Sequence, residues 1–300
     1  MKERIQKYTD QLISNLTKFD IIPVSQKEIN YGLQILFSQN KEKIPVNIYY
    51  SPKKGISIIV GGSELSPLKK KIKNILGIES NPEIEKHTWK RWVGTDESGK
   101  GDFFGPLVVC GFLIKRSEIE DFEKLKIRDS KLMKEDEIIK TGRYLLEHYS
   151  SRIESIQLNP NKYNELYDKF TSQGKKLNEL LAWMHARVII NLQKKHKIEG
   201  FVIDRFTADK VLKDSLKDMK EIRFHNIIKA ESDFAVAAAS IVARFKFIVA
   251  LRNLTKRYNI EFPKGANNFV ISTAKKFVER FGKNRLSSVS KIHFNTYSKI

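Results

Sequence analysis

Two adjacent carboxylates, Asp96 and Glu97, stand in the stretch GTDESGKGDFFGP at 94–106, where an apolar segment gives way to glycines. Neighbouring side chains of a regular strand point to opposite faces, so both acids share one site only if the strand ends between them. Gly99, Gly101 and Gly105 permit the backbone conformations that such an ending needs. The pair is therefore a candidate metal-ligating site. A surface turn whose acids bond local backbone amides is the alternative on this segment alone.

Two further acids occupy comparable positions later in the chain. Asp204 ends the short apolar run at 201–203, and the ends of such strands are where α/β sheets gather ligands. Glu231 stands just before the alanine-rich run FAVAAASIVARF, for which Ser232 or Asp233 is a natural N-cap. The alternative for Glu231 is a first-turn acid stabilised by the helix dipole.

Several carboxylates gathered in one place raise one another's pKa unless cations neutralise them. Two divalent ions roughly 3.5–4 Å apart would do so and would form a site suited to phosphodiester hydrolysis. Because the candidate ligands are oxygens without His or Cys, magnesium or manganese is favoured over zinc.

The same segment partly matches a phosphate-binding loop, with four residues between Gly94 and the pair Gly99 and Lys100. Two features oppose this interpretation. Gly101 stands where the magnesium-binding Ser or Thr should be, and the two carboxylates would repel phosphates. A nucleotide hydrolase is therefore disfavoured.

After Thr88 the chain alternates apolar strand-like runs with helical patterns, which predicts an α/β domain with a mixed sheet. Its last third is predicted to be helical, and Cys110 to be a small core residue. The expected strands cover residues 91–95, 107–115, 152–158, 200–203 and 221–227, and the expected late helices cover 233–258 and 268–281.

The first part of the chain predicts a smaller α+β module. An amphipathic helix is expected over 2–19, a strand from Ile29 to Phe37 with Tyr31 and Phe37 in the core, and a second helix over 65–76. Strands are also expected at 46–50 and 56–60. Residues 77–88 are a candidate linker, so we expect domains at 1–86 and 87–300.

Charge points to a polyanionic partner, since 55 Lys and Arg against 35 Asp and Glu give a formal net charge of +20. A merely solvated basic surface is the alternative. The longest apolar runs are too short to span a bilayer, and the charged first twenty residues do not resemble a secretory signal. The single cysteine supports neither a disulfide nor a cysteine-based metal centre. We expect a cytoplasmic monomer without membrane contact.

The separated motifs together resemble the type-2 ribonucleases H, bacterial endonucleases that cut RNA in RNA/DNA hybrids. The chain is similar to the ribonuclease HIII branch of that family, because Lys100 stands between two glycines where the HII branch has Arg, and Glu231 stands where HII has Asp. The motifs are DESGKGDFFGPL at 96–107, RDSKLM at 128–133, IDRF at 203–206, KAES at 229–232 and AVAAASIVAR at 235–244.

The resemblance implies a ribonuclease H-like catalytic domain behind an N-terminal substrate-binding module like the TATA-box-binding protein. It implies hydrolysis of the RNA strand by two-metal-ion catalysis, leaving 5′-phosphate and 3′-hydroxyl ends, with magnesium or manganese as cofactor. A non-catalytic nucleic-acid-binding protein is the alternative function.

The resemblance also assigns roles to individual residues. Asp96, Glu97, Asp204 and Glu231 would be the catalytic metal ligands. Gly99, Lys100 and Gly101 would contact ribose 2′-hydroxyls, and Ser130 and Lys131 would hold phosphate. It leaves open whether Asp233 belongs to the site and what His293 does.

Overall fold

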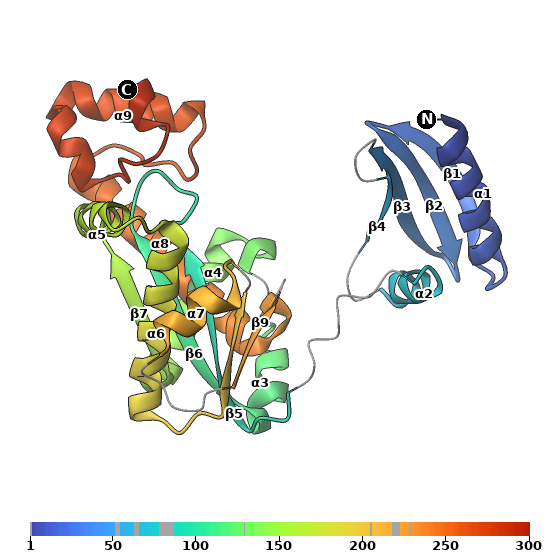
Figure 1. The fold of residues 1–300 in the computed structure, drawn as a ribbon, viewed down its shortest axis with the longest axis horizontal. Coiled ribbons are helices and arrows are strands. Elements are labelled where there is room, and N and C mark those ends of the chain that lie inside the picture. Colours follow the sequence, from blue (N-terminus) through green and yellow to red (C-terminus); the bar gives the residue numbers. More distant parts are fainter. Residues whose placement is uncertain are drawn as a thin grey trace. The chain divides into compact units, whose positions relative to one another are not determined.

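The computed structural model describes residues 2–51, 55–62, 66–77, 87–128, 130–204, 206–217, 223–227 and 230–300, with the backbone alone at 2–5, 7, 51, 227 and 231. The chain divides into two compact units, residues 1–86 and 87–300, called here the N-terminal and C-terminal units (Figure 1). The expected linker falls largely on residues 78–86, which lie outside the described ranges.

The N-terminal unit is a four-stranded antiparallel sheet in the order β1-β2-β3-β4, with α1 and α2 packed on one face. Its elements are α1 (Lys2–Thr17), β1 (Ile22–Ile29), β2 (Gly32–Gln39), β3 (Glu42–Ser51), β4 (Gly55–Val60) and α2 (Pro67–Ile75). Leu16 of α1 and Ile72 of α2 are fully buried against Ile35 and Phe37 of β2. The predicted antiparallel sheet is therefore confirmed.

The single strand predicted from Ile29 to Phe37 is wrong. The chain turns at Asn30 and Tyr31, and Tyr31 has a φ of 64° and is 84% exposed, so its predicted core position is also wrong. Phe37 is fully buried, as predicted. The period-two pattern runs unbroken across the turn and hides it, and β1 escaped prediction because this edge strand is almost wholly exposed.

The C-terminal unit is built on a five-stranded mixed sheet in the order β7-β6-β5-β8-β9. The strands are β5 (Arg91–Ser98), β6 (Leu107–Lys115), β7 (Ile153–Leu158), β8 (Gly200–Asp204) and β9 (Arg223–Ile227). The central strand β5 pairs antiparallel with β6 and parallel with β8. All five predicted strands and the mixed α/β class are confirmed.

Helices cover both faces of this sheet (Figure 1). They are α3 (Ile119–Lys124), α4 (Glu135–Tyr149), α5 (Pro160–Ser172), α6 (Leu177–Lys195), α7 (Asp209–Ser215), α8 (Phe234–Tyr258) and α9 (Asn268–Phe281). Short 3₁₀ turns lie at Arg116–Glu118, Ser130–Leu132, Ser150–Arg152, Ala230–Ser232, Lys283–Ser288 and Tyr297–Lys299.

The two helical layers divide the side chains of β5 between them. Trp92 packs in the core formed with α8, whereas Val93 packs in the core formed with α6. A glycine at position 94 lets α8 approach closely, since a Cβ atom there would lie 2.1 Å from the backbone nitrogen of Val236. Residues of β5 that follow therefore face α8 and α6 in turn.

Helix α8 has the length and apolar composition of a membrane span, the one such helix among the described residues. Its apolar window is 67% buried inside the fold, and Val236, Ile241 and Val242 belong to the core of the C-terminal unit. The packing of α8 on β5 and β6 therefore accounts for its apolar character.

Candidate active site

Two of the predicted acids meet at one edge of the sheet. Thr95 of β5 pairs with Ile203 of β8 in parallel register, so the residues that follow them, Asp96 and Asp204, stand at the same level on neighbouring strands. Neighbouring strands lie about 4.8 Å apart. The parallel pairing thus brings together two carboxylates that are far apart in sequence.

The segment that carries Glu231 reaches the same edge. The backbone nitrogen of Ala230 donates to Oδ1 of Asp204 at 3.3 Å, which places the residue before Glu231 against that carboxylate. Glu231 itself lies in the short Ala230–Ser232 turn, and its side chain is outside the described residues. The backbone therefore brings the position of the fourth predicted acid to Asp204.

Asp96 and Glu97 are both part of a strand that continues to Ser98, so the strand does not end between them. They contact opposite layers. The Ser240 hydroxyl of α8 donates to Asp96, whereas Oε2 of Glu97 lies 3.4 Å from Nε2 of His185 on α6. Burial and the charge of Glu97 raise the pKa of Asp96 to about 8, although Ser240 and Lys131 partly offset them.

Glu97 is held between two cationic or donor groups. His185 lies on the side of Oε2, and Nζ of Lys100 lies 3.5 Å from Oε1. Burial alone would raise the pKa of Glu97, but the hydrogen bond and charge of His185 and the charge of Lys100 outweigh it and hold that pKa below its usual value.

His185 is a residue that the sequence reasoning missed. It lies in the apolar helical pattern LLAWMHARVII, where a histidine resembles a core position, and it is 0% exposed. Its only signal in the sequence is that it is a titratable residue within an otherwise apolar helix. Its contact with Glu97 depends on the packing of α6 on β5, which the sequence does not reveal.

The glycine turn after Glu97 has the backbone geometry that glycine alone adopts easily. Gly99 has a φ of +91°, and a Cβ atom there would lie 2.1 Å from the carbonyl oxygen of Pro106. Of the predicted ribose-contacting residues, Gly101 is exposed and the side chain of Lys100 is 37% exposed, whereas Gly99 is buried.

The loop that follows this turn is fixed by a buried lysine from the C-terminal segment. Nζ of Lys291 donates to the carbonyl oxygens of Asp102 at 2.7 Å and Gly105 at 2.8 Å. The backbone nitrogen of Lys291 donates to the carbonyl oxygen of Phe103. Burial lowers the pKa of Lys291 to about 7. Residues near the end of the chain thus anchor the loop next to the site.

Ser130 and Lys131, the predicted phosphate-holding pair, lie differently from one another. Ser130 is buried, with its Oγ 2.8 Å from Oγ of Ser240, and Nη1 of Arg244 donates to its carbonyl oxygen at 3.0 Å. Lys131 is exposed, and its charge acts on Asp96. The Ser130 hydroxyl therefore faces Ser240 in this arrangement and not the solvent.

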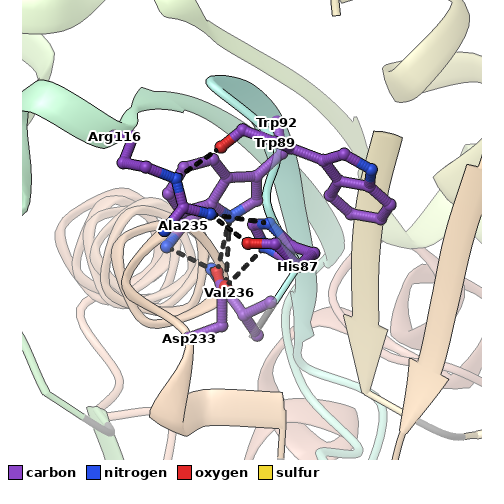
Figure 2. Close-up of polar contacts among 7 residues, drawn as sticks. All are labelled: His87, Trp89, Trp92, Arg116, Asp233, Ala235 and Val236. Carbon is purple, nitrogen blue, oxygen red and sulfur yellow. Dashed lines mark hydrogen bonds and ion pairs between the residues drawn. The ribbon is translucent and has the colours of Figure 1, made fainter. Parts of the chain in front are cut away.

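The contacts of Asp233 stabilise the fold at the start of α8 (Figure 2). Its Oδ1 accepts from the backbone nitrogens of Ala235 at 2.8 Å and Val236 at 3.2 Å, which caps α8. Nε1 of Trp92 donates to both of its oxygens at 3.0 and 3.1 Å, and His87 lies 3.5 Å away. Trp92 precedes Asp96 by four strand residues, roughly 13 Å, so these contacts hold Asp233 away from Asp96.

Arg116 completes the surroundings of Asp233 by fixing the first residues of the unit. Its guanidinium donates to the backbone carbonyl oxygens of Trp89, at 2.9 Å, and of His87. It also lies over the ring of Trp92, and the His87 ring stacks on Trp89 (Figure 2). The N-terminal end of this unit is therefore tied to the start of α8.

His293 packs in an aromatic group. Its ring stacks on Tyr167 with centroids 4.2 Å apart, and its Nδ1 lies 3.5 Å from the hydroxyl of Tyr163. Burial lowers the pKa of His293 to about 4. These contacts give it a packing role within the C-terminal segment.

The donor set suits a divalent cation. All four predicted ligands are carboxylates, and Asp96 is a carboxylate whose burial and like-charged neighbour oppose its ionisation. A cation would remove that opposition. Among the described side chains, which do not include that of Glu231, no three His, Cys, Asp or Glu form a preassembled metal cluster.

Comparison with known proteins identifies the family. The model of the family Ribonuclease HII matches residues 93–297. Ribonuclease HIII of Chlamydia felis (strain Fe/C-56) is 41% identical over 212 residues, which cover 69% of this chain and 69% of that protein. Ribonuclease HIII of Bacillus cereus (strain ATCC 14579) is 38% identical over 216 residues, 69% of this chain and 67% of that protein. The chain belongs to the type-2 ribonuclease H family. Within it, the relatives place the chain in the ribonuclease HIII branch.

Solved structures show the same fold. The crystal structure of Bst-RNase HIII in complex with Mn²⁺ superposes with a TM-score of 0.66 at 23% identity, covering 98% of this chain and 95% of that one. Aquifex aeolicus RNase H3 superposes with a TM-score of 0.54 over 98% of both chains. The solved structures thus share the α/β fold and the N-terminal antiparallel sheet of this chain. The family model and the relatives identify the chain as a ribonuclease H, a hydrolase.

Proposed function

We propose that the protein hydrolyses the RNA strand of RNA/DNA hybrids with two divalent cations and leaves 5′-phosphate and 3′-hydroxyl ends. The main support for this proposal is the parallel register of β5 and β8, because it places Asp96 and Asp204 side by side at the same end of these two strands. The contact between Ala230 and Asp204 brings the Glu231 segment to the same edge. The Mn²⁺ bound by Bst-RNase HIII supports a divalent cofactor.

Asp96, Glu97, Asp204 and Glu231 would hold the cations, with magnesium or manganese suited to an all-oxygen set. Bound there, the ions would supply charge neutralisation, activation of the attacking water and stabilisation of the leaving oxygen. The Ser240 hydroxyl donates to Asp96 and helps to fix the orientation of that ligand.

Recognition of RNA would come from the turn at Gly99, Lys100 and Gly101. A backbone free of bulky side chains can approach ribose 2′-hydroxyls closely, and that hydroxyl distinguishes RNA from DNA. Lys100 and Lys131 are exposed at least in part and lie beside Glu97 and Asp96, where they can attract the phosphates that flank the scissile bond. Ser130 would contribute through its buried hydroxyl, which lies 2.8 Å from that of Ser240, and through its position next to Lys131.

The N-terminal unit would add affinity through the face of its sheet opposite α1 and α2. Lys27, Gln34, Asn47 and Ile59 pair with one another across the four strands, and the neighbouring row with Ile35 faces the helices. Nε2 of Gln34 donates to Oδ1 of Asn47 at 2.7 Å. Amide and ammonium donors on the sheet face opposite the two helices suit contacts with phosphate and sugar that carry no sequence information.

The test is cleavage of a hybrid labelled at either end of its RNA strand, beside duplex RNA and duplex DNA, with Mg²⁺, with Mn²⁺ and with chelator. We expect cleavage of the hybrid's RNA strand alone, abolished by chelator, with products that a 5′-phosphate-dependent exonuclease degrades. Cleavage that survives chelation, or products with 5′-hydroxyl ends, would contradict the proposal.

A further inference from the structure

His185 is a buried polar residue to which the proposed chemistry assigns no role. It lies on α6 among apolar neighbours, is 0% exposed, and its ring stacks on Phe206 with centroids 4.9 Å apart. A polar ring in such a place costs stability unless its nitrogens are satisfied. Because it is sealed from solvent, His185 acts only through the groups that it touches.

The two ring nitrogens face groups of β5. Nδ1 lies 2.9 Å from Oγ1 of Thr95, which is itself fully buried. Nε2 lies 3.4 Å from Oε2 of Glu97, and no group among the described residues forms a hydrogen bond with it in this geometry. The Glu97 carboxylate is therefore the group toward which Nε2 is directed.

These neighbours decide which nitrogen carries the proton. If Nδ1 carried it alone, a lone pair on Nε2 would face the carboxylate, which is unfavourable. The Thr95 hydroxyl can donate to Nδ1, which leaves the hydrogen on Nε2, and in the imidazolium form Nε2 also carries a hydrogen. In both favourable states an N–H group points from His185 to Oε2 of Glu97.

The two oxygens of Glu97 are held in different ways. Lys100 approaches Oε1 at 3.5 Å from a long side chain that is 37% exposed, whereas His185 is packed in a helix under Phe206. The lysine side chain can turn toward a substrate phosphate, whereas the histidine is fully buried. The orientation of the Glu97 carboxylate is thus set from the side of Oε2.

We propose that His185 is a positioning residue that donates from Nε2 to Oε2 of Glu97 and orients this carboxylate for the divalent cation. The inference rests on the proposed function, since it takes Glu97 as a cation ligand. Groups that orient a metal ligand typically change metal affinity by roughly 10- to 100-fold when removed.

The test measures Mn²⁺ binding to the full chain by titration calorimetry, without substrate, for the wild type and five variants, of which Glu97→Gln removes the charge of the proposed ligand. His185→Leu removes the donor, His185→Gln keeps an N–H donor near the position of Nε2, and Thr95→Val removes the partner of Nδ1. His196→Leu is the matched control, because His196 caps the C-terminal end of the same helix, is partly exposed, and has its Nε2 2.7 Å from the carbonyl oxygen of Ser151. Hybrid-cleavage kinetics are measured on the same proteins.

We expect His185→Leu to weaken Mn²⁺ binding by roughly 10- to 100-fold and to lower kcat at limiting Mn²⁺, with KM for the hybrid unchanged. His185→Gln should recover most of the affinity, Thr95→Val should lose several-fold, and His196→Leu should match the wild type. High Mn²⁺ should restore cleavage by His185→Leu.

Unchanged Mn²⁺ affinity in folded His185→Leu would overturn the inference and leave the proposed function standing. If His185→Leu does not fold, wild-type affinity in Thr95→Val together with a full loss in His185→Gln would overturn it. A wild type that binds no Mn²⁺, or a Glu97→Gln variant that binds it normally, would overturn the assignment of Glu97 and the inference with it.

Discussion

Replacing Asp233 with alanine removes three interactions at once from the start of α8. The carboxylate caps the helix by accepting from the backbone nitrogens of Ala235 and Val236, and it accepts from Nε1 of Trp92 (Figure 2). Both Asp233 and Trp92 are buried, so water cannot replace the lost partner. We expect Asp233→Ala to reduce the stability of the C-terminal unit without weakening divalent cation binding.

The size of the effect follows from these contacts. Loss of a helix N-cap costs about 1 kcal/mol, and a buried indole N–H without an acceptor costs about 1–3 kcal/mol. The sum is about 2–4 kcal/mol in the free energy of unfolding. For a unit of this size, that corresponds to a fall in Tm of roughly 4–16 °C.

Urea unfolding of the C-terminal unit, followed by tryptophan fluorescence, measures the change. Asp233→Asn should lose much less, because its amide oxygen can still accept at the cap. Asp121→Ala, at an exposed acid on α3, is the control and should change stability by less than about 0.5 kcal/mol. If Asp233→Ala instead keeps its stability and loses Mn²⁺ affinity, Asp233 belongs to the cation site and our assignment is wrong.

Two further predictions concern other parts of the chain. Burial holds the pKa of Lys291 near 7 in the folded protein, whereas the ordinary pKa of lysine is 10.5. Between about pH 7 and pH 10.5 the unfolded chain therefore binds one more proton than the folded one. The free energy of unfolding of the wild type should rise with pH across that window by up to about 1.4 kcal/mol per pH unit. Lys291→Met should lack this rise when urea unfolding is compared at pH 7 and pH 9; an equal rise in both proteins would contradict it. Deleting residues 1–86, which keeps His87 and its contact with Asp233, should weaken hybrid binding far more than it changes the cleavage rate at saturating hybrid, and equal binding by the truncated protein would contradict the role of the N-terminal unit.

Much of the C-terminal unit could be predicted because its strands are short apolar runs separated by clear turns. β6, for example, is buried along nearly its whole length, and such a run is visible in sequence. The N-terminal hairpin was harder. The alternating pattern from Ile29 to Phe37 continues through the turn at Tyr31, and periodicity alone does not show where a chain reverses.

Some features of the candidate site could likewise be predicted from the sequence, and others could not. The position of Asp204 at the end of a buried strand could be predicted, and the register of β5 and β8 places it beside Asp96. The roles of His185 and Ser240 could not, because both depend on which helix packs over which face of β5. Asp233 and Glu231 are both acids just before α8, and the bonds of Asp233 with Ala235, Val236 and Trp92 distinguish it as the helix cap.

The most direct test of the carboxylate site compares single-turnover cleavage of an RNA/DNA hybrid by the wild type, Asp96→Asn and Asp233→Asn, all in Mn²⁺ and well below their Tm. Asp96→Asn should cut at least about 100-fold more slowly, because several kcal/mol of charge stabilisation depend on bound cations. It should keep its fold and its affinity for the hybrid. Asp233→Asn should cut at nearly the wild-type rate. Cleavage by Asp96→Asn at the wild-type rate would contradict the account.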